Sequence, residues 1–357
     1  MGDKKKKKNS GIARFFDVIF SLALLAGVGW GGYYIVTHGT AVEQKTNYTD
    51  NITEETTEET TEPGTVYNSI EISNQEVYNG SLILVNSEYP FQGSEENLVS
   101  LYQVMLEKDC HSFGGANSAE VKVQQEYAEK LIEMFDAFYN ATYDNNVIVQ
   151  SGYRSAERQQ ELYDADLQKN NRDYSDTVAK AGYSEHQTGW GVDLTLYQAD
   201  YDGTGIYSWI GEHCAEFGII LRYPEDKTSV TNIIFEPWHY RYVGQPHSDY
   251  ITASGLCLEE YITLLYGYPY EGEHLIISAE KNGIYETYEV YYYPADTSAD
   301  TTMLPVPADK EYTVSGNNID GFIVAVDTGE TAVPATETND TPEDEPNETE
   351  TVEEVTE

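Results

Sequence analysis

The pattern of hydrophobic and polar positions divides the chain into segments of different character. Residues 15–36 (FFDVIFSLALLAGVGWGGYYIV) form an apolar run with one charged residue, Asp17. A helix of this length can cross the hydrocarbon core of a bilayer. Residues 4–8 are all lysine, and lysines in front of such a helix favour a cytoplasmic N-terminus. The pattern predicts a retained transmembrane helix, with the chain after Val36 on the outer side of the cell membrane.

A cleaved signal peptide is the alternative interpretation of the same run. Its apolar region normally spans about 7–15 residues and is followed by an A-x-A-like cleavage site. No such site follows Val36, which favours the anchor. We therefore expect residues 1–14 to be a cytoplasmic basic segment. The acidic, Thr/Glu-rich residues 37–67 then form an extended linker.

Helical and strand-like runs follow one another between residues 68 and 255. Apolar residues recur at helical spacing from Ser118, a suitable N-cap, to about Asn140. Further helices are expected after Ser155 and over residues 207–217. Strand-like runs occur at 81–86, at 145–152, at 192–198 and within 231–244. Because these elements mix without regular alternation, the segment is expected to be a small α+β domain of helices and antiparallel sheet.

The rest of the chain has a different pattern. Residues 256–328 contain short β-like runs divided by Gly, Asn and Pro, which predict a small β-rich addition without a readable functional motif. The runs are LIISAE, GIYETYEVYYYPAD, KEYTVSG and GFIVAVDT. The acidic tail, residues 329–357, has the composition of the linker and is expected to be disordered.

Charge and cysteine content narrow the class of protein. The chain has 62 acidic and 20 basic residues, a formal net charge of −42. Such a surface repels nucleic acid and anionic wall polymers, which excludes a nucleic-acid-binding function. Cys110, Cys214 and Cys257 are odd in number and widely spaced, so they do not indicate a disulfide framework. The sequence is also consistent with one disulfide between two of them and a buried thiol at the third, and it does not indicate which two would pair.

A histidine and an aspartate stand seven residues apart in SEHQTGWGVD, residues 184–193. Gly189 and Gly191 disfavour a helix here, so we expect a loop that enters a strand. Asp193 lies on the polar face of that strand, and His186 on the loop can fold back beside it. An imidazole and a carboxylate that converge in this way suit a zinc ion. On spacing alone, a hydrogen-bonded structural pair is the commoner explanation.

A third metal-ligand candidate, His239, lies in FEPWHYRYV, residues 235–243. On a regular strand Glu236 and His239, three residues apart, would point to opposite faces. Pro237 interrupts a strand ladder, so both side chains can face one cleft. Two imidazoles and one carboxylate leave a zinc ion with an open position for water, whose pKa falls to about 7 there. Glu236, a carboxylate outside the ligand set, is the candidate base.

A hydrolase also needs a positive group for the substrate carboxylate or the developing oxyanion. SGYRS, residues 151–155, places Arg154 after a strand and before a helix N-terminus. Anions favour a helix N-terminus, and a guanidinium adds a forked hydrogen-bond donor. Arg154 is therefore the candidate for this role.

These motifs together resemble a known family. SGYRS followed by Gln160, then SEHQTGWGVD, RYP at 222–224 and EPWHYRYVG at 236–244 are similar to the zinc D-alanyl-D-alanine carboxypeptidases of the VanY type. The group also contains the VanX dipeptidases, and the resemblance covers roughly residues 81–255. Trp190 stands where smaller or aliphatic residues are frequent in the family, so we expect it to reshape the substrate pocket.

The resemblance implies a role for each candidate residue. It implies one zinc ion per chain, bound by His186, Asp193 and His239. Glu236 is implied as general base and acid, and Arg154 as the group that holds substrate or the tetrahedral intermediate.

The function that follows from the resemblance is a membrane-anchored, extracytoplasmic carboxypeptidase that removes the terminal D-alanine from peptidoglycan stem peptides. One alternative is an L,D-carboxypeptidase that acts on tetrapeptide stems. Another is a non-catalytic peptidoglycan-binding module, which the presence of Glu236 beside a complete ligand set argues against.

Overall fold

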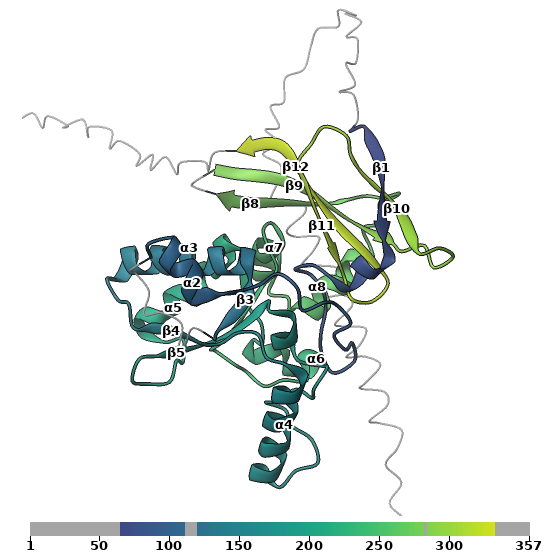
Figure 1. Cartoon of the computed structure of the whole chain (residues 1–357). Helices are drawn as coiled ribbons and strands as arrows, with labels where there is room; N and C mark the ends of the chain where they lie inside the picture. Colours follow the sequence, from purple (N-terminus) through teal and green to yellow (C-terminus); the bar gives the residue numbers. More distant parts are fainter. Residues whose placement is uncertain (1–64, 111–119, 282–283, 333–357) are drawn as a thin grey trace, which may run out of the picture.

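The computed structural model of the chain describes residues 65–110, 120–281 and 284–332 (Figure 1). The expected basic segment and anchor, almost all of the linker, Ser118 and the tail from residue 333 lie outside these ranges. Within them, no helix combines the length and apolar character that crossing a membrane requires.

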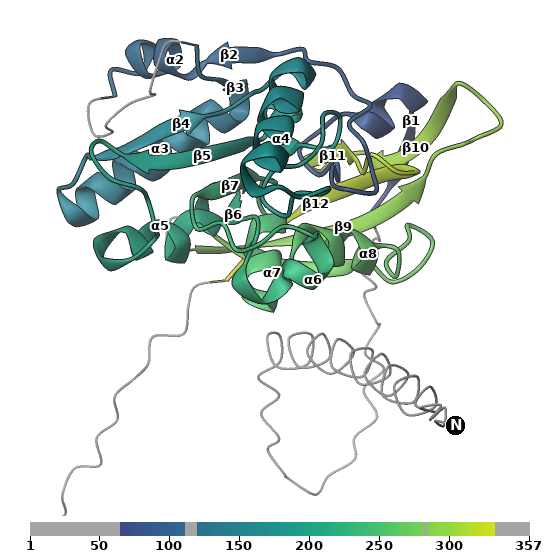
Figure 2. The ribbon, with the colours of Figure 1, turned by 90° about the horizontal axis from the view of Figure 1, so that it is seen from below.

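A four-stranded antiparallel sheet is the centre of the part that carries the candidate residues. In spatial order its strands are β4 (Val147–Ser151), β5 (Gly191–Leu196), β7 (His239–Tyr242) and β6 (Ile219–Leu221). Helix α3 (Gln125–Thr142) lies across one face of the sheet, and α4 (Ala156–Asn170) projects from the other (Figures 1 and 2). Helix α2 (Leu101–Glu107) and the pair β2 (Leu98–Ser100) and β3 (Lys122–Gln124) flank α3.

A second four-stranded antiparallel sheet occupies the C-terminal part. Its strands, in spatial order, are β11 (Tyr312–Gly316), β12 (Gly321–Ala332), β9 (Ile284–Pro294) and β8 (Leu275–Lys281). Beside it, β1 (Tyr67–Ser73) pairs with β10 (Thr301–Pro307) in an antiparallel sheet of two strands. The first described strand therefore pairs with the last third of the chain.

Short helices make the remaining connections. They are η1 (Asn74–Tyr78), η2 (Glu185–Thr188), η3 (Gly205–Tyr207), α5 (Ser208–His213), η4 (Cys214–Phe217), η5 (Glu225–Lys227), α6 (Thr228–Thr231), α7 (His247–Ser254) and α8 (Leu258–Leu265). Helices α7 and α8 lie between the two large sheets (Figures 1 and 2).

The expected mixture of helices and antiparallel sheet is confirmed, and several elements match closely. The run at 145–152 forms β4, the run at 192–198 forms β5, and the four C-terminal runs form β8, β9, β11 and β12. Ser155 caps α4, since its Oγ accepts a hydrogen bond from the backbone N of Arg158 at 3.3 Å. None of the three cysteines, all within the described residues, forms a disulfide.

Three expected elements differ from the structure. Residues 81–86 form no strand. The helix expected from Ser118 begins at Gln125, because Lys122–Gln124 pair with β2 instead. The helix expected at 207–217 consists of η3, α5 and η4, which end at Gly218 with a left-handed φ of 77°.

Strands β1 and β10 were not expected. The sequence of β10, TTMLPVP, contains two prolines, which argue against a central strand. β10 has only β1 as a partner among the described strands, so it has an open edge where a missing N–H donor is tolerated.

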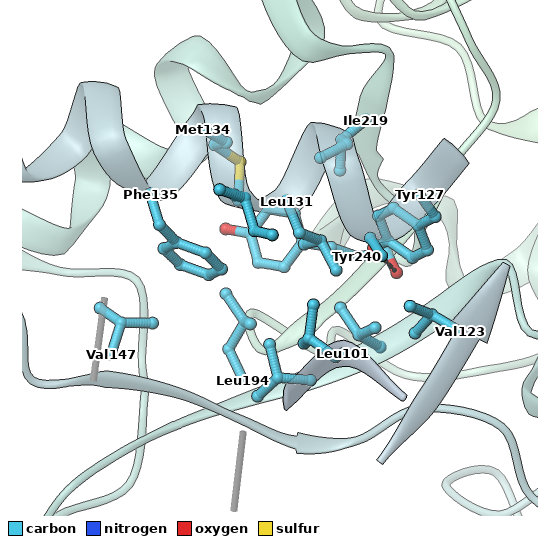
Figure 3. Close-up of a cluster of buried hydrophobic side chains, with 14 of the residues drawn as sticks. Leu101, Val123, Tyr127, Leu131, Met134, Phe135, Val147, Leu194, Ile219 and Tyr240 are labelled. Carbon is cyan, nitrogen blue, oxygen red and sulfur yellow. Dashed lines mark hydrogen bonds between the residues drawn. The ribbon is translucent and has the colours of Figure 1, made fainter. Parts of the chain in front are cut away.

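Three clusters of buried hydrophobic side chains occur among the described residues, and two of them contain residues of the sheet that carries the site. The first packs α3 on the sheet through residues such as Tyr127, Leu131, Phe135, Leu194 and Tyr240 (Figure 3). The second joins residues of the first sheet region, of α8 and of the C-terminal sheet, including Ile220, Leu258, Tyr261, Ile277 and Ile323. The two sheets are thus parts of one continuous packed structure.

His247 of α7 lies in this second core. It is 4% exposed, and its Nδ1 lies 2.7 Å from the hydroxyl of Tyr261 in α8. Burial lowers the pKa of His247 to about 3. Below about pH 6.5 the unfolded chain binds a proton that the folded chain does not, so this residue's contribution to stability is full above that pH. The contribution decreases as the pH falls towards the folded pKa.

We predict that the stability difference between wild type and His247→Gln decreases by roughly 1.5 kcal/mol between pH 6.5 and pH 5. Urea unfolding at both pH values measures it. The comparison with the variant is needed because burial raises the pKa of nearby Asp249 to about 6. This shift makes the folded protein more stable as the pH falls, which is opposite to the effect of His247. Tyr261→Phe, which keeps His247 buried, should retain the wild-type pH dependence. A stability difference that stays constant with pH would contradict the prediction.

Candidate metal centre

The local conformation of SEHQTGWGVD brings its two ionisable residues together. His186 lies in the one-turn helix η2, which ends at Gly189 with a left-handed φ of 73°. Gly191 begins β5, and a Cβ there would lie 3.3 Å from Nε2 of His239. The first glycine permits the reversal of the chain, and the second permits the close approach of β7. The flexible residues between His186 and Asp193 therefore have geometric roles.

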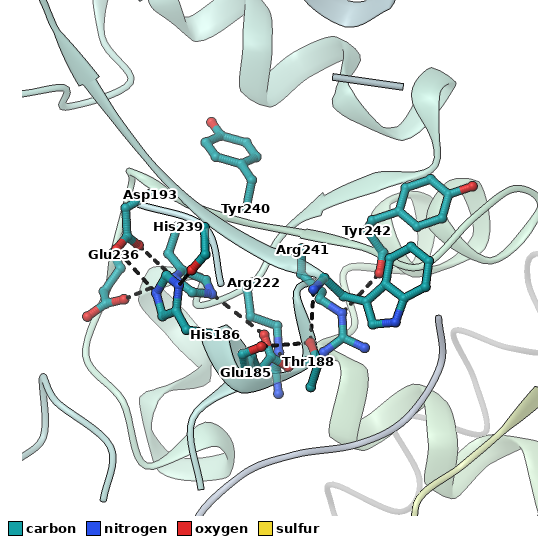
Figure 4. Close-up of polar contacts among 12 residues, drawn as sticks. Glu185, His186, Thr188, Asp193, Arg222, Glu236, His239, Tyr240, Arg241 and Tyr242 are labelled. Carbon is teal, nitrogen blue, oxygen red and sulfur yellow. Dashed lines mark hydrogen bonds and ion pairs between the residues drawn. The ribbon is translucent and has the colours of Figure 1, made fainter. Parts of the chain in front are cut away.

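Strand pairing and a turn place the other two residues. Asp193 of β5 and His239 of β7 are direct partners in the antiparallel ladder. Before β7 the chain turns at Pro237, and the backbone N of His239 donates to the carbonyl of Glu236 at 3.1 Å. The expected interruption of the strand is present. It lets Glu236 and His239 face the same side (Figure 4).

His186, Asp193 and His239 form a compact cluster. Nε2 of His186 lies 3.2 Å from Oδ2 of Asp193, and Nδ1 of His239 lies 2.9 Å from Oδ1. One ligand atom from each residue lies within 4.8 Å of the others. Both histidines are buried, and Asp193 is partly exposed to a cavity of about 330 Å³.

The hydrogen bonds of the two imidazoles assign their nitrogens. Nδ1 of His186 lies 2.7 Å from the carbonyl oxygen of Gly152, which can only accept, so Nδ1 carries the proton and Nε2 has a free lone pair. Nε2 of His239 lies 3.6 Å from Oε2 of Glu185. Both of these atoms are buried, and neither has a hydrogen-bond partner among the described residues. A proton on Nε2 would leave Nδ1 of His239 free to bind a metal.

The cluster fits a zinc ion. Two neutral imidazoles and one carboxylate are a common set of three protein ligands at catalytic zinc sites, with the fourth position open. Ligand atoms about 2.1 Å from a tetrahedral centre lie roughly 3.4 Å apart, close to the separations seen here. Burial alone would lower the pKa of His239, but its hydrogen bond to Asp193 raises the pKa to about 9. A bound cation takes the place of this proton.

Glu236 lies beside the cluster without belonging to it. Its Oε2 is 4.0 Å from Nδ1 of His239, and the residue is 7% exposed. Burial raises the pKa of Glu236 to about 7, although His239 opposes the shift. A carboxylate with this pKa can both accept and return a proton near neutral pH.

Arg154 lines the same cavity. Its guanidinium donates to Oε1 of Gln159 and to Oγ of Ser151, each at 2.9 Å, and lies 3.4 Å from Oδ2 of Asp193. These contacts hold the positive group at the edge of the cluster. All five predicted residues, His186, Asp193, His239, Glu236 and Arg154, are thus brought to one cavity.

The expectation for Trp190 is not met. Trp190 does not line this cavity; it stacks on Tyr242 with ring centroids 5.3 Å apart, so its expected effect on the pocket is wrong. Trp238 lines the cavity wall. His213 pairs with Glu216, and neither it nor Cys214 belongs to a metal-binding group among the described residues.

The sequence interpretation missed a buried ionic group behind His239. Oε1 of Glu185 accepts hydrogen bonds from Nε of Arg222 at 2.7 Å and from Nη1 of Arg241 at 2.8 Å. Arg222 also donates to both carboxylate oxygens of Glu259 in α8, at 2.8 and 2.7 Å. Burial alone would raise the pKa of Glu185, but the two arginines hold it well below its usual range. The sequence did contain a signal for this group. Arg222 in IILRY and Arg241 in WHYRY are charged residues among apolar and aromatic ones, and a charged residue in such a run is buried only when it is paired.

Comparison with known proteins agrees with this geometry. A family model described as VanY: D-alanyl-D-alanine carboxypeptidase matches residues 120–245. A D-alanyl-D-alanine carboxypeptidase of Enterococcus faecium is 35% identical over 317 residues, which cover 88% of this chain and 97% of the relative. The chain belongs to the VanY family.

Solved structures include relatives of this VanY protein. The vancomycin resistance D,D-dipeptidase VanXYg, crystallised with a D-Ala-D-Ala phosphinate analogue, is 32% identical with a TM-score of 0.62. The match covers 73% of this chain and 99% of that chain. A VanY variant from a VanB-type resistance cassette, solved with Zn(II), is 35% identical, covering 51% of this chain and 98% of that chain, with a TM-score of 0.40.

The position of Glu185 behind His239 generates a prediction for metal affinity. Glu185→Gln keeps the shape of the side chain but removes the charge that faces Nε2 of His239. Loss of a carboxylate partner of a ligating histidine typically weakens metal binding by about 10–100-fold. We therefore expect the dissociation constant for zinc, measured by chelator competition, to increase by about this factor.

Two controls make the result interpretable. Thermal unfolding monitored by circular dichroism shows whether Glu185→Gln is folded. Glu133→Gln, which changes an exposed carboxylate paired with Lys130, should leave zinc affinity unchanged. A folded Glu185→Gln protein with wild-type zinc affinity would show that Glu185 does not support His239.

Proposed function

We propose that this chain is a zinc-dependent D-alanyl-D-alanine carboxypeptidase that removes the terminal D-alanine from peptidoglycan stem peptides. The observation that carries the proposal is the cluster of His186, Asp193 and His239, with Glu236 beside it, in a member of the VanY family. The cavity of about 330 Å³ is large enough for the end of a peptide.

His186, Asp193 and His239 would hold the zinc ion. When bound, zinc polarises the scissile carbonyl and lowers the pKa of a coordinated water. The carbonyl of Gly152 accepts from Nδ1 of His186, and the carboxylate of Glu185 lies 3.6 Å behind Nε2 of His239, so that the other nitrogen of each imidazole faces the cavity. The ligands are therefore fixed before substrate enters.

Glu236 is proposed as the group that moves the proton. Its carboxylate accepts a proton from the attacking water and returns it to the amine of the departing D-alanine. In the metal-free site burial raises the pKa of Glu236 to about 7, so a carboxylate in this position can both accept and return a proton near neutral pH.

Arg154 is proposed to bind the C-terminal carboxylate of the peptide. Ser151 and Gln159 hold its guanidinium in place, and a carboxylate matches the geometry of a guanidinium fork. A substrate anchored there places its last peptide bond beside the metal ligands and Glu236.

The location of the protein is a separate proposal. The apolar residues 15–36 and the lysines before them support a single retained membrane anchor, with the catalytic part outside the cell membrane. This arrangement places the active site in the compartment where peptidoglycan lies.

We predict that Glu236→Gln retains zinc but releases D-alanine about 10²–10⁴ times more slowly than wild type. The measurement is D-alanine release from a stem pentapeptide, with zinc content determined on the same samples. Glu225→Gln, which changes an exposed carboxylate outside the cavity, is the matched control and should keep wild-type activity. Wild-type turnover by Glu236→Gln would contradict the assigned role.

A parallel assay separates the two peptide specificities. Wild type should release D-alanine from the pentapeptide in preference to the corresponding tetrapeptide. The reverse preference would favour the L,D-carboxypeptidase alternative while leaving the metal site unchanged.

We also predict that the full chain stays with membranes after alkaline carbonate washing of producing cells. For this test a short epitope tag is added at the N-terminus, which the proposal places in the cytoplasm. Protease added to cells without a wall should digest the catalytic part and leave this tag protected. A protein released into the medium and beginning after residue 36 would show instead that the apolar run is a cleaved signal peptide.

A further inference from the structure

A second cavity of about 300 Å³ adjoins the active-site cavity. The two share the side chains of Val178, Ala179, Tyr223 and Ile233. The second cavity, which we call the outer cavity, is lined in addition by Asn86, Ser87, Tyr163, Tyr174, Ser175, Lys180, Tyr183, Thr231 and Asn232. The outer cavity therefore lies next to the active-site cavity, and these four residues separate its lining from the metal ligands. We call the two adjoining cavities the groove.

The lining of the outer cavity has a distinct chemistry. Among the described residues that line it there is no carboxylate, and Lys180 is the only one with a charged side chain. This composition stands out in a chain with 62 acidic residues. Tyrosine rings supply apolar surface with polar tips. Asn86 and Asn232 also line the cavity, but their amides already donate to the side chains of Glu259 and Ser87. Such a cavity suits an uncharged peptide backbone that carries one negative group.

The loop that carries Lys180 is tied to the active site. Nε2 of Gln159, a contact of Arg154, donates to the carbonyl of Ala179 at 2.6 Å. Oε1 of Gln187 in η2 accepts from the backbone N of Gly182 at 2.5 Å. Lys180 itself is exposed, so its ammonium is accessible from the groove. These bonds fix the position of the loop relative to α4 and to the turn that holds His186.

The direction of a bound peptide follows from Arg154. Arg154 lines the active-site cavity but not the outer cavity. A peptide whose C-terminal carboxylate lies at Arg154 and that runs past the metal ligands reaches Tyr223 and Ile233. The ring of Tyr223 lies 5.0 Å from that of His239, so the shared wall begins directly beside the cluster. An extended chain advances about 3.3–3.6 Å per residue, and its earlier residues enter the outer cavity.

We propose that the outer cavity binds the part of the substrate before the scissile bond, and that Lys180 selects a peptide with a free carboxylate in that part. The inference rests on the proposed function, which supplies the peptide and its direction. It extends that function by naming the charge that the upstream residues carry.

The test uses two pentapeptides that end in D-Ala-D-Ala and differ in one upstream side carboxylate, free in one and amidated in the other. The readout is the ratio of kcat/KM for D-alanine release by the zinc-loaded full chain. A partly exposed ion pair contributes at most about a fivefold difference. We expect wild type to prefer the free carboxylate by about three- to fivefold, and the preference to decrease in 0.5 M salt, a concentration that shortens the Debye length to roughly 4 Å.

Variants at two lysines assign the preference. Lys180→Ala should bring the ratio close to one, and Lys180→Glu should reverse it. Lys169→Ala, which changes an exposed lysine of α4 that lines neither cavity, should keep the wild-type ratio. A wild-type ratio of one, or a preference that survives in Lys180→Ala, would overturn the inference while leaving the proposed function intact. Release of D-alanine from neither peptide would overturn the proposed function itself.

Discussion

One buried carboxylate, that of Glu185, joins the active site to the rest of the structure. Glu185, Arg222 and Arg241 have no exposed side-chain surface. Removing one partner from such a group leaves an uncompensated charge away from water, which is strongly destabilising. Glu185 comes from η2 and Arg241 from β7, and Arg222 directly follows β6. The metal ligand His186 follows Glu185 in the sequence, and His239 lies two residues before Arg241 on the same strand. The positions of the ligands therefore depend on the ionic contacts that join η2 to Arg222 and to β7.

This ionic group also explains the expected strand that is absent. Nη2 of Arg241 donates to the backbone carbonyls of Ser81 and Ile83 at 2.8 and 3.0 Å. On the other side, the backbone N of Leu82 donates to Oγ of Ser315 at 2.9 Å, and that of Leu84 donates to the carbonyl of Asn317 at 3.2 Å. Buried backbone groups must be paired, and here an arginine and the C-terminal sheet pair them in place of a neighbouring strand. The apolar pattern of SLILVN correctly indicates burial, since Leu82, Ile83, Leu84 and Val85 are all buried. It does not show which groups satisfy the backbone.

Local patterns in the sequence predict local features, whereas contacts between distant residues could not be predicted. The sequence predicted that His186, Asp193, His239, Glu236 and Arg154 share one cavity, because they lie in short motifs that together resemble the VanY type. Only part of this rests on local geometry, such as the turn at Pro237. Strands β4 and β5 were predictable because their periods are local as well. Glu185 could not be assigned, because its partners lie 37 and 56 residues away. The pairing of β1 with β10 joins residues more than 200 positions apart, for example Ile70 with Leu304, and β10 carries prolines that hide its strand character. Long-range contacts of this kind leave no periodic signal in either partner.

The charge distribution of the site links the metal to the base. Three carboxylates line the cavity among the described residues, and Arg222 and Arg241 compensate the charge of one of them, Glu185. The other two are those of Asp193 and Glu236. Both are subject to desolvation, yet their pKa values move apart: His186 and His239 hold that of Asp193 well below its usual range, whereas burial raises that of Glu236 to about 7.

A cation beside a carboxylate favours its ionised form, so Glu236 becomes a more complete proton acceptor when the three ligands hold a divalent ion. Without the ion, part of Glu236 is protonated at neutral pH and is not available as a base. The ability to accept a proton is therefore greatest in the state in which the site also holds the ion that activates water, although the chain as a whole carries a formal charge of −42.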